Sequence, residues 1–287
     1  MNKPFNASYM KASIRQATLV LLTLLGQQAA IAQDSHGIDT LVSRKAVTSA
    51  KLFGIGYTQH LDTYLSPGEY SGAELRFVSH TIRDNDGHPL SKLIVHQGFL
   101  SSTKNKAHNA NELAGLYTFS YGLLYNWHFL DGNINLKAGA TTNLELGFDY
   151  NLRNSNNPAQ LRAALNISPT AAITYDTHLG NFPITLRYEL AAPLMGVMFS
   201  PNYGQSYYEI FSRGDYDHNA VFTHPFNTPS LHHMLTLDIT VMRQTFRMGY
   251  LGDVRQARVN GLRQHQYTHA LVIGWVKHFR LIKYSPR

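Results

Sequence analysis

The chain has 287 residues, of which 44% are hydrophobic and 15% are charged. It contains 17 Tyr, 14 Phe and 21 Gly, a composition that suits β-rich structure better than a helical cytosolic enzyme. It contains no Cys, which excludes disulfides, iron–sulfur clusters and thiol catalysis.

The N-terminus has the pattern of a cleavable secretory signal. Lys3, Lys11 and Arg15 precede a short apolar run at 19–25, and small residues follow up to Ala32. A basic region, a short apolar region and an Ala-x-Ala site define a signal peptide. The apolar run is too short to span a bilayer. We therefore predict that the first 32 residues form a signal peptide that is cleaved near Ala32.

The formal net charge of +7 overstates the basic character of the exported chain. Three of the 25 basic residues leave with the signal, so 22 remain against 18 acidic residues. These basic residues are scattered, with no Lys/Arg run and no nucleic-acid motif, so we expect no nucleic-acid partner. No later stretch of 18 apolar residues is present, so no transmembrane helix is predicted in the mature chain.

Alternation of apolar and polar residues with a period of two is the main structural signal. In the segment 134–150, one face is Ile, Leu, Ala, Thr, Phe and Tyr, and the other is Asn, Lys, Gly, Thr, Glu and Asp. Such alternation places successive side chains on opposite faces of a strand. It recurs in segments of similar character at 113–129, 161–176, 182–190, 231–241 and 267–279, and more weakly at 51–65, 70–82, 91–102 and 245–255.

Two kinds of β-barrel fit this alternation, and they differ in which face of each strand points to the interior. A soluble secreted barrel would bury its apolar face around an apolar ligand, whereas an outer-membrane barrel turns that face to lipid. The strands are longer than a soluble barrel needs, and the polar faces mix Gly, Thr, Asn and both charge signs, as a crowded lumen does. Aromatic residues lie near the ends of the apolar faces, as in interfacial girdles; they are Tyr117, Trp127, Phe129, Phe148, Tyr150, Trp275 and Phe279.

The sequence thus predicts an all-β fold, a closed antiparallel transmembrane β-barrel of about ten strands. We place the barrel at 51–287, after the signal peptide at 1–32 and an N-terminal periplasmic segment at 33–50. Only closed barrels and helices satisfy their backbone hydrogen bonds within a membrane. The predicted location is the cell outer membrane, with outer-membrane lipid and the barrel-assembly machinery as partners.

Connection lengths provide a check, because such barrels alternate short periplasmic turns with longer outer loops. The even-numbered connections are short, at 84–89, 130–133, 178–181 and near 243–244. The longer odd-numbered ones are 103–111, 151–158, 196–230 and 256–264, whereas the first, at 66–69, is short. The seventh, 196–230, includes a possible helical turn at 206–212. It is either a recognition loop or an ordered cap without a ligand.

The segment from Leu61 to Gly72, Leu-Asp-Thr-Tyr-Leu-Ser-Pro-Gly-Glu-Tyr-Ser-Gly, resembles a family of Bacteroidota outer-membrane proteins known only as a domain of unknown function. The resemblance implies an outer-membrane barrel and supplies no activity. Pro67-Gly68 is a good centre for a type II turn, and the flanking carboxylates can accept hydrogen bonds from backbone or from Arg76. A structural turn is favoured over a ligand site; the residues that carry the resemblance are Asp62, Tyr64, Pro67, Glu69 and Tyr70.

The favoured function is non-enzymatic: a narrow channel, a binder of a surface component, or a scaffold. It requires charges on the polar faces to pair inside a lumen that side chains largely fill. The residues predicted to form this lumenal charge network are Glu74, Arg76, Lys137, Glu145, Arg162, Arg187, Glu189, Asp238 and Arg247.

The alternative is an outer-membrane hydrolase acting on lipid or peptide. Asp84 and Asp86 in one connection and Asp217-His218 in another supply the residue types of an Asp/His pair, but these connections lie at opposite ends of a barrel. Ser79 and His80 are adjacent in a strand and point to opposite faces. The 15 His show no metal-ligand spacing, so no metal, cofactor or catalytic residue is assigned.

Overall fold

The computed structural model describes residues 43–85, 88–155, 157–180, 182–242 and 244–283. No helix in this part of the chain is long and apolar enough to cross a membrane. In chain order the elements are β1 (Ser43–Asp62), β2 (Tyr70–Asn85), β3 (Leu90–Asn105), β4 (Asn111–Phe129), the 3₁₀ turn η1 (Leu130–Gly132), β5 (Ile134–Asn151), β6 (Ala159–Leu179), β7 (Phe182–Ala191), β8 (Met195–Phe199), α2 (Tyr207–Arg213), β9 (Ala220–Thr223), β10 (Leu231–Val241), β11 (Gln244–Val259) and β12 (Leu262–Lys283).

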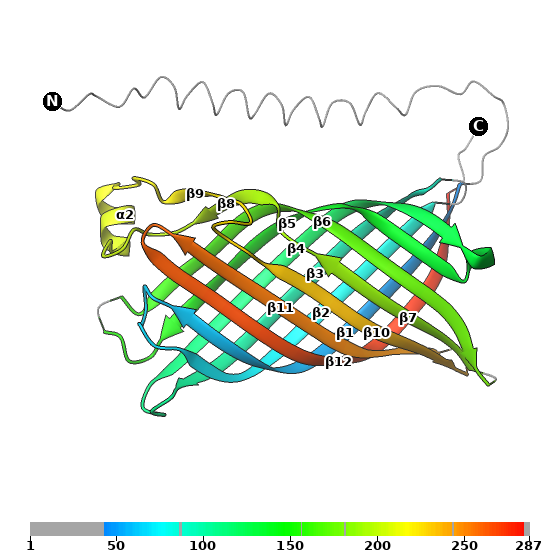
Figure 1. Ribbon diagram of the computed structural model, residues 1–287, viewed down its shortest axis with the longest axis horizontal. Coiled ribbons are helices and arrows are strands. Elements are labelled where there is room, and N and C mark those ends of the chain that lie inside the picture. The colour runs from blue at the N-terminus through cyan, green and yellow to red at the C-terminus, as the bar shows by residue number, and fades with distance from the viewer. Residues whose placement is uncertain (1–42, 86–87, 156, 181, 243, 284–287) are drawn as a thin grey trace, which may run out of the picture. The chain divides into compact units, whose positions relative to one another are not determined.

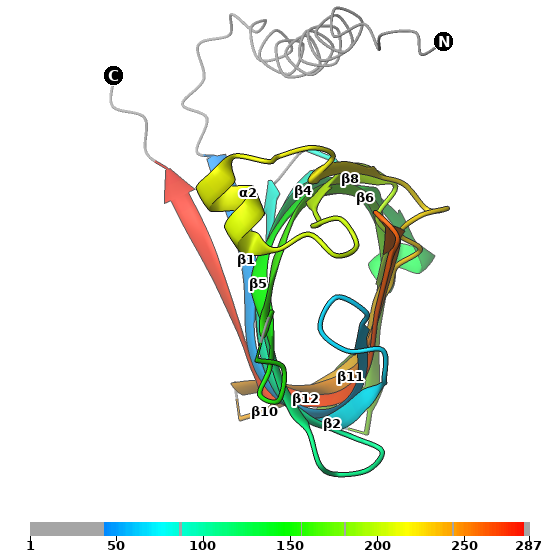
Figure 2. The same ribbon diagram turned by 90° about the vertical axis from the view of Figure 1, so that its left-hand side faces the viewer.

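Ten of these strands form a closed antiparallel barrel (Figures 1 and 2). Each of β1 to β6 pairs with the next strand, β7 pairs with β10, and β10 to β12 continue the sheet. The ring closes where β12 pairs with β1, from Ser43 opposite Lys283 to Asp62 opposite Gln264. Closure leaves no free edge, which satisfies the backbone without water. The predicted ten-stranded barrel is confirmed.

The remaining two strands extend the wall beyond the ends of β7 and β10. Strand β8 pairs with the first half of β6 at Ala164–Ile167, and β9 pairs with β8. Leu194 N donates to Ile167 O, so the chain from β7 to β8 keeps contact with β6. The predicted loop 196–230 is therefore a hairpin with a short helix at its tip.

The barrel starts earlier than the sequence indicated. Strand β1 begins at Ser43, and Lys45 already lies opposite Asn85 of β2, so the boundary at residue 51 is corrected. The residues before position 51 are mostly small, polar or basic, which hides the alternation, but backbone pairing with β12 extends the strand. The predicted signal peptide, and the part of the predicted periplasmic segment before Ser43, lie outside the described residues.

The two ends of the barrel differ. At the terminal end, Ser43 and Lys283 lie beside the short β2–β3, β4–β5, β6–β7 and β10–β11 connections. At the loop end lie the connections 63–69, 106–110, 152–158 and 192–230 and the β11–β12 turn. That last turn is only Asn260-Gly261, both with positive φ (52° and 74°), so the longer connection predicted at 256–264 is wrong. Asn-Gly is the preferred pair for a tight hairpin, and the strands run up to it.

Side chains alternate across the wall as predicted. Ile55, Leu75, Leu100 and Leu271 point outward and are 63–68% exposed. The residues between these along each strand face the lumen. Thr58, for example, is fully buried. The predicted girdle aromatics on the outer face are also exposed, including both tryptophans. This arrangement is the inverse of a soluble barrel, because the oily face points away from the lumen.

Candidate functional site

The lumen contains the nine charged residues that alternation assigned to the polar faces. Each of them forms at least one ion pair within the barrel. The nine fall into separate groups at different heights rather than into one cluster; they are Glu74, Arg76, Lys137, Glu145, Arg162, Arg187, Glu189, Asp238 and Arg247.

One chain of ion pairs crosses the lumen near the loop end. Arg76 Nε donates to Glu74 Oε1 at 2.7 Å, and Arg76 Nη1 donates to Asp253 Oδ2 at 3.0 Å. Arg255 continues the chain, with Nε at 3.1 Å from Asp253 Oδ1 and Nη1 at 2.7 Å from Glu145 Oε2. Strands β2, β11 and β5 are thereby linked through alternating charges. Such buried pairs constrain geometry, since each partner left alone is a costly buried charge.

A second group lies beside it, around His60. The His60 ring bonds to Glu112 through Nδ1, and its Nε2 lies 3.5 Å from Asp149 Oδ2. Arg162 Nη1 donates to Asp149 Oδ2 at 3.3 Å, and Asn151 Nδ2 donates to Glu112 Oε2 at 3.3 Å. His60 is 1% exposed, so this His–carboxylate group is closed to a substrate in the described structure.

Further pairs line the other side of the barrel. Arg187 and His80 both bind Glu189, which lies between them. Arg247 makes a two-pronged contact with Asp238, at 2.6 Å and 2.7 Å, directly across from it in the β10–β11 register. These contacts brace β2, β7, β10 and β11.

A smaller polar group lies nearest the terminal end. Lys137 Nζ is 2.6 Å from Asp84 Oδ1 and 3.0 Å from Ser91 Oγ. Asn126 Nδ2 also donates to Ser91 Oγ, at 2.7 Å. The group connects β2, β3, β4 and β5 on the side of the lumen nearer the terminal end.

Between these polar groups, apolar side chains fill the lumen. One cluster is formed by β1, β2, β10, β11 and β12, and another by β2, β3 and β4, with Val95 packed against both. Alternation alone did not predict an apolar lumenal layer. The members, which we call the lumenal plug, are Leu52, Val78, Met234, Leu251 and Val272 in the first cluster and Ile82, Leu93 and Leu124 in the second.

The segment that carries the family resemblance forms the β1–β2 connection. Asp62 is buried, accepts the Tyr64 backbone N–H at 2.9 Å through Oδ1, and accepts Gln264 Nε2 at 2.6 Å through Oδ2. The Tyr70 hydroxyl accepts Asn151 Nδ2 at 2.9 Å. Asp62 and Tyr70 therefore tie this connection to the barrel rim.

The type II turn expected in this segment is wrong, and of the hydrogen bonds expected for its carboxylates the backbone one forms, at Asp62. Gly68 does not have the positive φ of a type II turn centre; its N–H instead donates to Ser66 Oγ at 3.3 Å, because Ser66 offers a local acceptor. Pro67-Gly68 forms an exposed bend. Neither Asp62 nor Glu69 contacts Arg76, whose partners lie in the lumen; Glu69 lies 3.3 Å from His265 Nε2.

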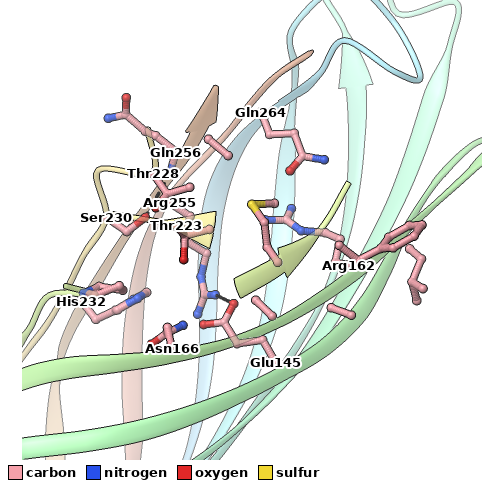
Figure 3. Close-up of a pocket in the computed structure, with 17 residues that line it drawn as sticks. Glu145, Arg162, Asn166, Thr223, Thr228, Ser230, His232, Arg255, Gln256 and Gln264 are labelled. Carbon is pink, nitrogen blue, oxygen red and sulfur yellow. Dashed lines mark hydrogen bonds and ion pairs between the residues drawn. The ribbon is translucent and has the colours of Figure 1, made fainter. Parts of the chain in front are cut away.

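The loop-end mouth contains a cavity of about 80 Å³. Figure 3 shows Arg162 and Arg255 among its side chains, with Arg255 directed at Glu145. Its polar lining consists mostly of hydroxyls and amides, and Met198, Phe199 and Pro193 add apolar surface. We call it the mouth pocket; its labelled residues are Glu145, Arg162, Asn166, Thr223, Thr228, Ser230, His232, Arg255, Gln256 and Gln264.

Two further voids lie next to the mouth pocket. The first, about 90 Å³, shares Glu145, His232 and Arg255 with it. The second, about 60 Å³, is lined by Val78, Met234 and other plug residues. The described lumen thus holds small voids of about 60 to 90 Å³, and residues of the lumenal plug line the 60 Å³ void.

The long connection forms an ordered cap beside the pocket. Helix α2 has a capping box, in which Ser206 Oγ accepts Glu209 N while the Glu209 carboxylate accepts Ser206 N, and its predicted position is confirmed. Tyr207 Oη donates to Gln160 Oε1 at 3.0 Å, and its ring packs edge-on against Tyr64 at 5.8 Å. Burial raises the pKa of Tyr64 to about 12 and raises that of Tyr207 as well, so both hydroxyls are neutral at physiological pH.

The hydrolase candidates are dispersed. Asp84 lies at the terminal end, and the exposed Asp217–His218 pair lies at the loop end, as the sequence indicated. His80 faces the lumen toward Glu189, whereas Ser79 is on the outer face. Within the described ranges, no group of three or more His, Asp or Glu is arranged to hold a metal ion.

Several lumenal partners were left out of the predicted network although the alternation rule places them on polar faces. Asp253 and Arg255 have the same parity as Arg247 in the 245–255 segment, so the face rule that found Arg247 also finds them. Glu112 and Asp149 likewise occupy recognised polar faces.

These features define the class: a closed ten-stranded antiparallel barrel with an oily exterior, a lumen filled by ion pairs and an apolar plug, and a pocket at one mouth. The family described as "Protein of unknown function (DUF3316)" matches residues 17–286, and the chain belongs to this family. No curated protein matches the sequence.

Solved structures with a similar chain trace are remote in sequence. The outer membrane protease OmpT from Escherichia coli has 8% identity and a TM-score of 0.41, covering 86% of this chain and 99% of that one. The translocator domain of the autotransporter NalP from Neisseria meningitidis has 9% identity and a TM-score of 0.35, with coverage of 92% and 97%. Neisserial surface protein A has 10% identity and a TM-score of 0.32, covering 79% of this chain and 96% of that one. At such values none of them assigns a function or a site to this chain.

Proposed function

We propose that the protein is an exported outer-membrane barrel that conducts no ions and binds a small polar group of a surface component at its mouth pocket. In this proposal the protein is not an enzyme and carries no cofactor. Its signal peptide is cleaved near Ala32, and the barrel-assembly machinery inserts it into outer-membrane lipid. A Bacteroidota source, which the 61–72 segment implies, is part of the same proposal.

The membrane location is supported by the exterior. Every strand of the ring carries outward apolar side chains that are at least 40% exposed, a surface that water would not tolerate but lipid does. The loop end, which carries the long capped connection, faces outward in this proposal, and the terminal end faces the periplasm.

The absence of conduction is supported by one observation: paired charges and the lumenal plug pack inside the described lumen, and the voids between them are small, about 60 to 90 Å³ each. An ion that entered at the loop end would have to pass between packed side chains and lose much of its hydration shell. The barrel is therefore a closed wall with a site at one end.

The kind of ligand is supported by the lining. Hydroxyls and amides such as Thr228, Ser230 and Gln264 can both donate and accept, while Phe199 offers an apolar face. The cavity has room for roughly six water molecules, enough for one small group rather than a polymer. A hydroxyl-rich headgroup or a terminal sugar of a surface glycolipid fits this chemistry.

Planar-bilayer recording of the refolded barrel tests the proposal. We expect no steady conductance for the wild type, and measurable conductance when Leu52→Ala, Val78→Ala and Leu251→Ala are combined, because water then enters the plug. The matched control combines Ile55→Ala, Leu75→Ala and Leu271→Ala on the outer face of neighbouring strands and should stay silent. Steady current through the wild type would reject the closed-barrel function.

Binding is tested on the same preparation with purified lipopolysaccharide, phospholipid and peptide. We expect saturable binding of a lipopolysaccharide saccharide that Thr228→Val and Gln264→Leu weaken, with no turnover of any of the three. Hydrolysis of one of them would instead support the enzymatic alternative.

A further inference from the structure

The outward faces of the ten wall strands carry no Asp or Glu at any described position. Among the side chains that the structure describes, four basic ones nevertheless point outward in the halves of the strands nearer the terminal end. They lie on the adjacent strands β12, β1, β2 and β3, and we call them the basic patch: Lys51, Arg83, Lys92 and Lys277.

The register brings these cations together in two pairs. Arg83 lies directly opposite Lys92 in the β2–β3 ladder. Lys51 lies opposite Trp275, and Lys277 is two residues further along the same strand. Like charges directly opposite one another destabilise a sheet. Within the described chain no carboxylate forms an ion pair with any of the four, so the patch has no protein counterion.

In the halves nearer the terminal end, the other six strands have no such feature. On β4, β5, β6, β7, β10 and β11, the outward residues of the corresponding halves are all uncharged. Trp127 shows the contrast, since its neighbours on the outer face are Tyr125, Phe129 and Leu136. Trp127 and Trp275 are 40% and 41% exposed, so two equally exposed tryptophans lie in different surroundings.

We propose that the basic patch binds the phosphate groups of anionic phospholipids in the leaflet at the terminal end of the barrel. Long Lys and Arg side chains reach along an apolar wall to place their charge at the lipid headgroups. Phosphate oxygens supply the counter-charge that the wall lacks, and they offset the repulsion between Arg83 and Lys92. Phe53, Phe77 and Trp275 pack beside the patch and hold the acyl chains of the same lipids.

This inference rests on the proposed membrane location and goes beyond it, because it assigns one side of the barrel a preference for one lipid class. The chain contains only two tryptophans, so each site can be observed alone. The reporter for the patch is Trp127→Phe, which leaves Trp275, and the reference is Trp275→Phe, which leaves Trp127.

Both proteins are reconstituted into phosphatidylcholine vesicles that contain a minor fraction of phosphatidylglycerol, with bromine on the acyl chains of one lipid at a time. We expect brominated phosphatidylglycerol to be enriched around Trp275 about fivefold, the effect that one basic residue supplies near an anionic lipid surface. Around Trp127 the two lipids should quench in proportion to their mole fractions. Added salt should reduce the enrichment at Trp275.

Variants separate the patch from basic charge in general. Lys51→Gln, Arg83→Gln, Lys92→Gln and Lys277→Gln together should abolish the enrichment at Trp275 and leave quenching at Trp127 unchanged, which also shows that the barrel still folds. The control is Arg258→Gln with Arg263→Gln, a cross-strand basic pair at the loop end that should not alter Trp275.

The outcomes are distinct. Equal partitioning of both lipids around Trp275 overturns the inference while leaving the membrane location intact. A lack of quenching of either tryptophan by either lipid shows that the protein does not insert, and so overturns the proposed function. If lipopolysaccharide displaces phosphatidylglycerol from Trp275 at equal mole fraction, the assignment to phospholipid is overturned.

Discussion

The two halves of the lumen are built on different principles. The half nearer the loop end is held by charge, with Arg76, Asp253 and Arg255 in a chain of pairs beneath the mouth pocket. The half nearer the terminal end combines the apolar lumenal plug with the ion pairs of Arg187 and Arg247 and the polar group around Lys137. Polar groups leave small voids that water and a ligand can occupy, whereas the plug closes the path.

This difference means that binding and closure are carried by separate side chains. A change in the charged half should alter stability and the pocket without opening the barrel. A change in the plug should weaken the seal without altering the chemistry of the pocket.

The largest expected effect is on the charged half. Arg76→Met leaves Glu74 and Asp253 without their shared cation, which costs about 3–5 kcal/mol of unfolding free energy. Urea unfolding of the refolded barrel, followed by its heat-dependent gel mobility, measures the loss. Arg83→Met, an outward change on the same strand, is the control and should be nearly neutral. The triple change that adds Glu74→Gln and Asp253→Asn should recover most of the stability; failure to do so would place the cost in packing rather than charge.

The next effect is in the plug. Leu93→Ala removes a side chain that is 1% exposed and leaves a cavity against Ile82 and Leu124, at a cost of about 3 kcal/mol. Leu100→Ala, on the outer face of the same strand, should cost clearly less, because lipid fills the space. The same urea titration compares them. Equal costs would contradict a plug that is packed more tightly than the lipid-facing wall.

The smallest effect is in the cap. Ser206→Ala removes the hydroxyl of the α2 capping box and should destabilise this helix locally by about 1 kcal/mol. Hydrogen exchange of the α2 amides should accelerate while the exchange of the barrel strands does not change. Ser212→Ala, near the exposed end of the same helix, is the matched control. Faster exchange in the strands would mean that the cap supports the whole barrel rather than the mouth.

Much of the architecture followed from local pattern. Strands β5 and β6 alternate cleanly because their lumenal faces are largely polar, and the positions of β4, β5 and β6 were predicted closely. Strands β1, β2 and β3 alternated weakly for a physical reason: their lumenal faces contribute Leu52, Val78 and Leu93 to the plug, so both faces are partly apolar. The weak alternation of β1, β2 and β3 therefore reflects the apolar side chains that these strands contribute to the lumenal plug.

The partners inside the lumen did not follow from the sequence. Arg255 binds Glu145, 110 residues away, and Arg76 binds Asp253, 177 residues away. Alternation states that each of these side chains points inward, but not which of the others it meets. The Asn260-Gly261 pair does indicate a tight hairpin turn from sequence alone, but a longer outer loop was expected at this end of the barrel.

By itself, therefore, the sequence determined the closed barrel, the face on which each side chain lies and the end that carries the helix, because a two-residue period and capping residues act within a few positions. Only the tertiary structure decided which charges pair, that apolar residues seal the lumen, and that four cations gather on one side of the wall. Those features depend on the register and shear at which ten tilted strands close into a ring, and these are properties of the whole sheet.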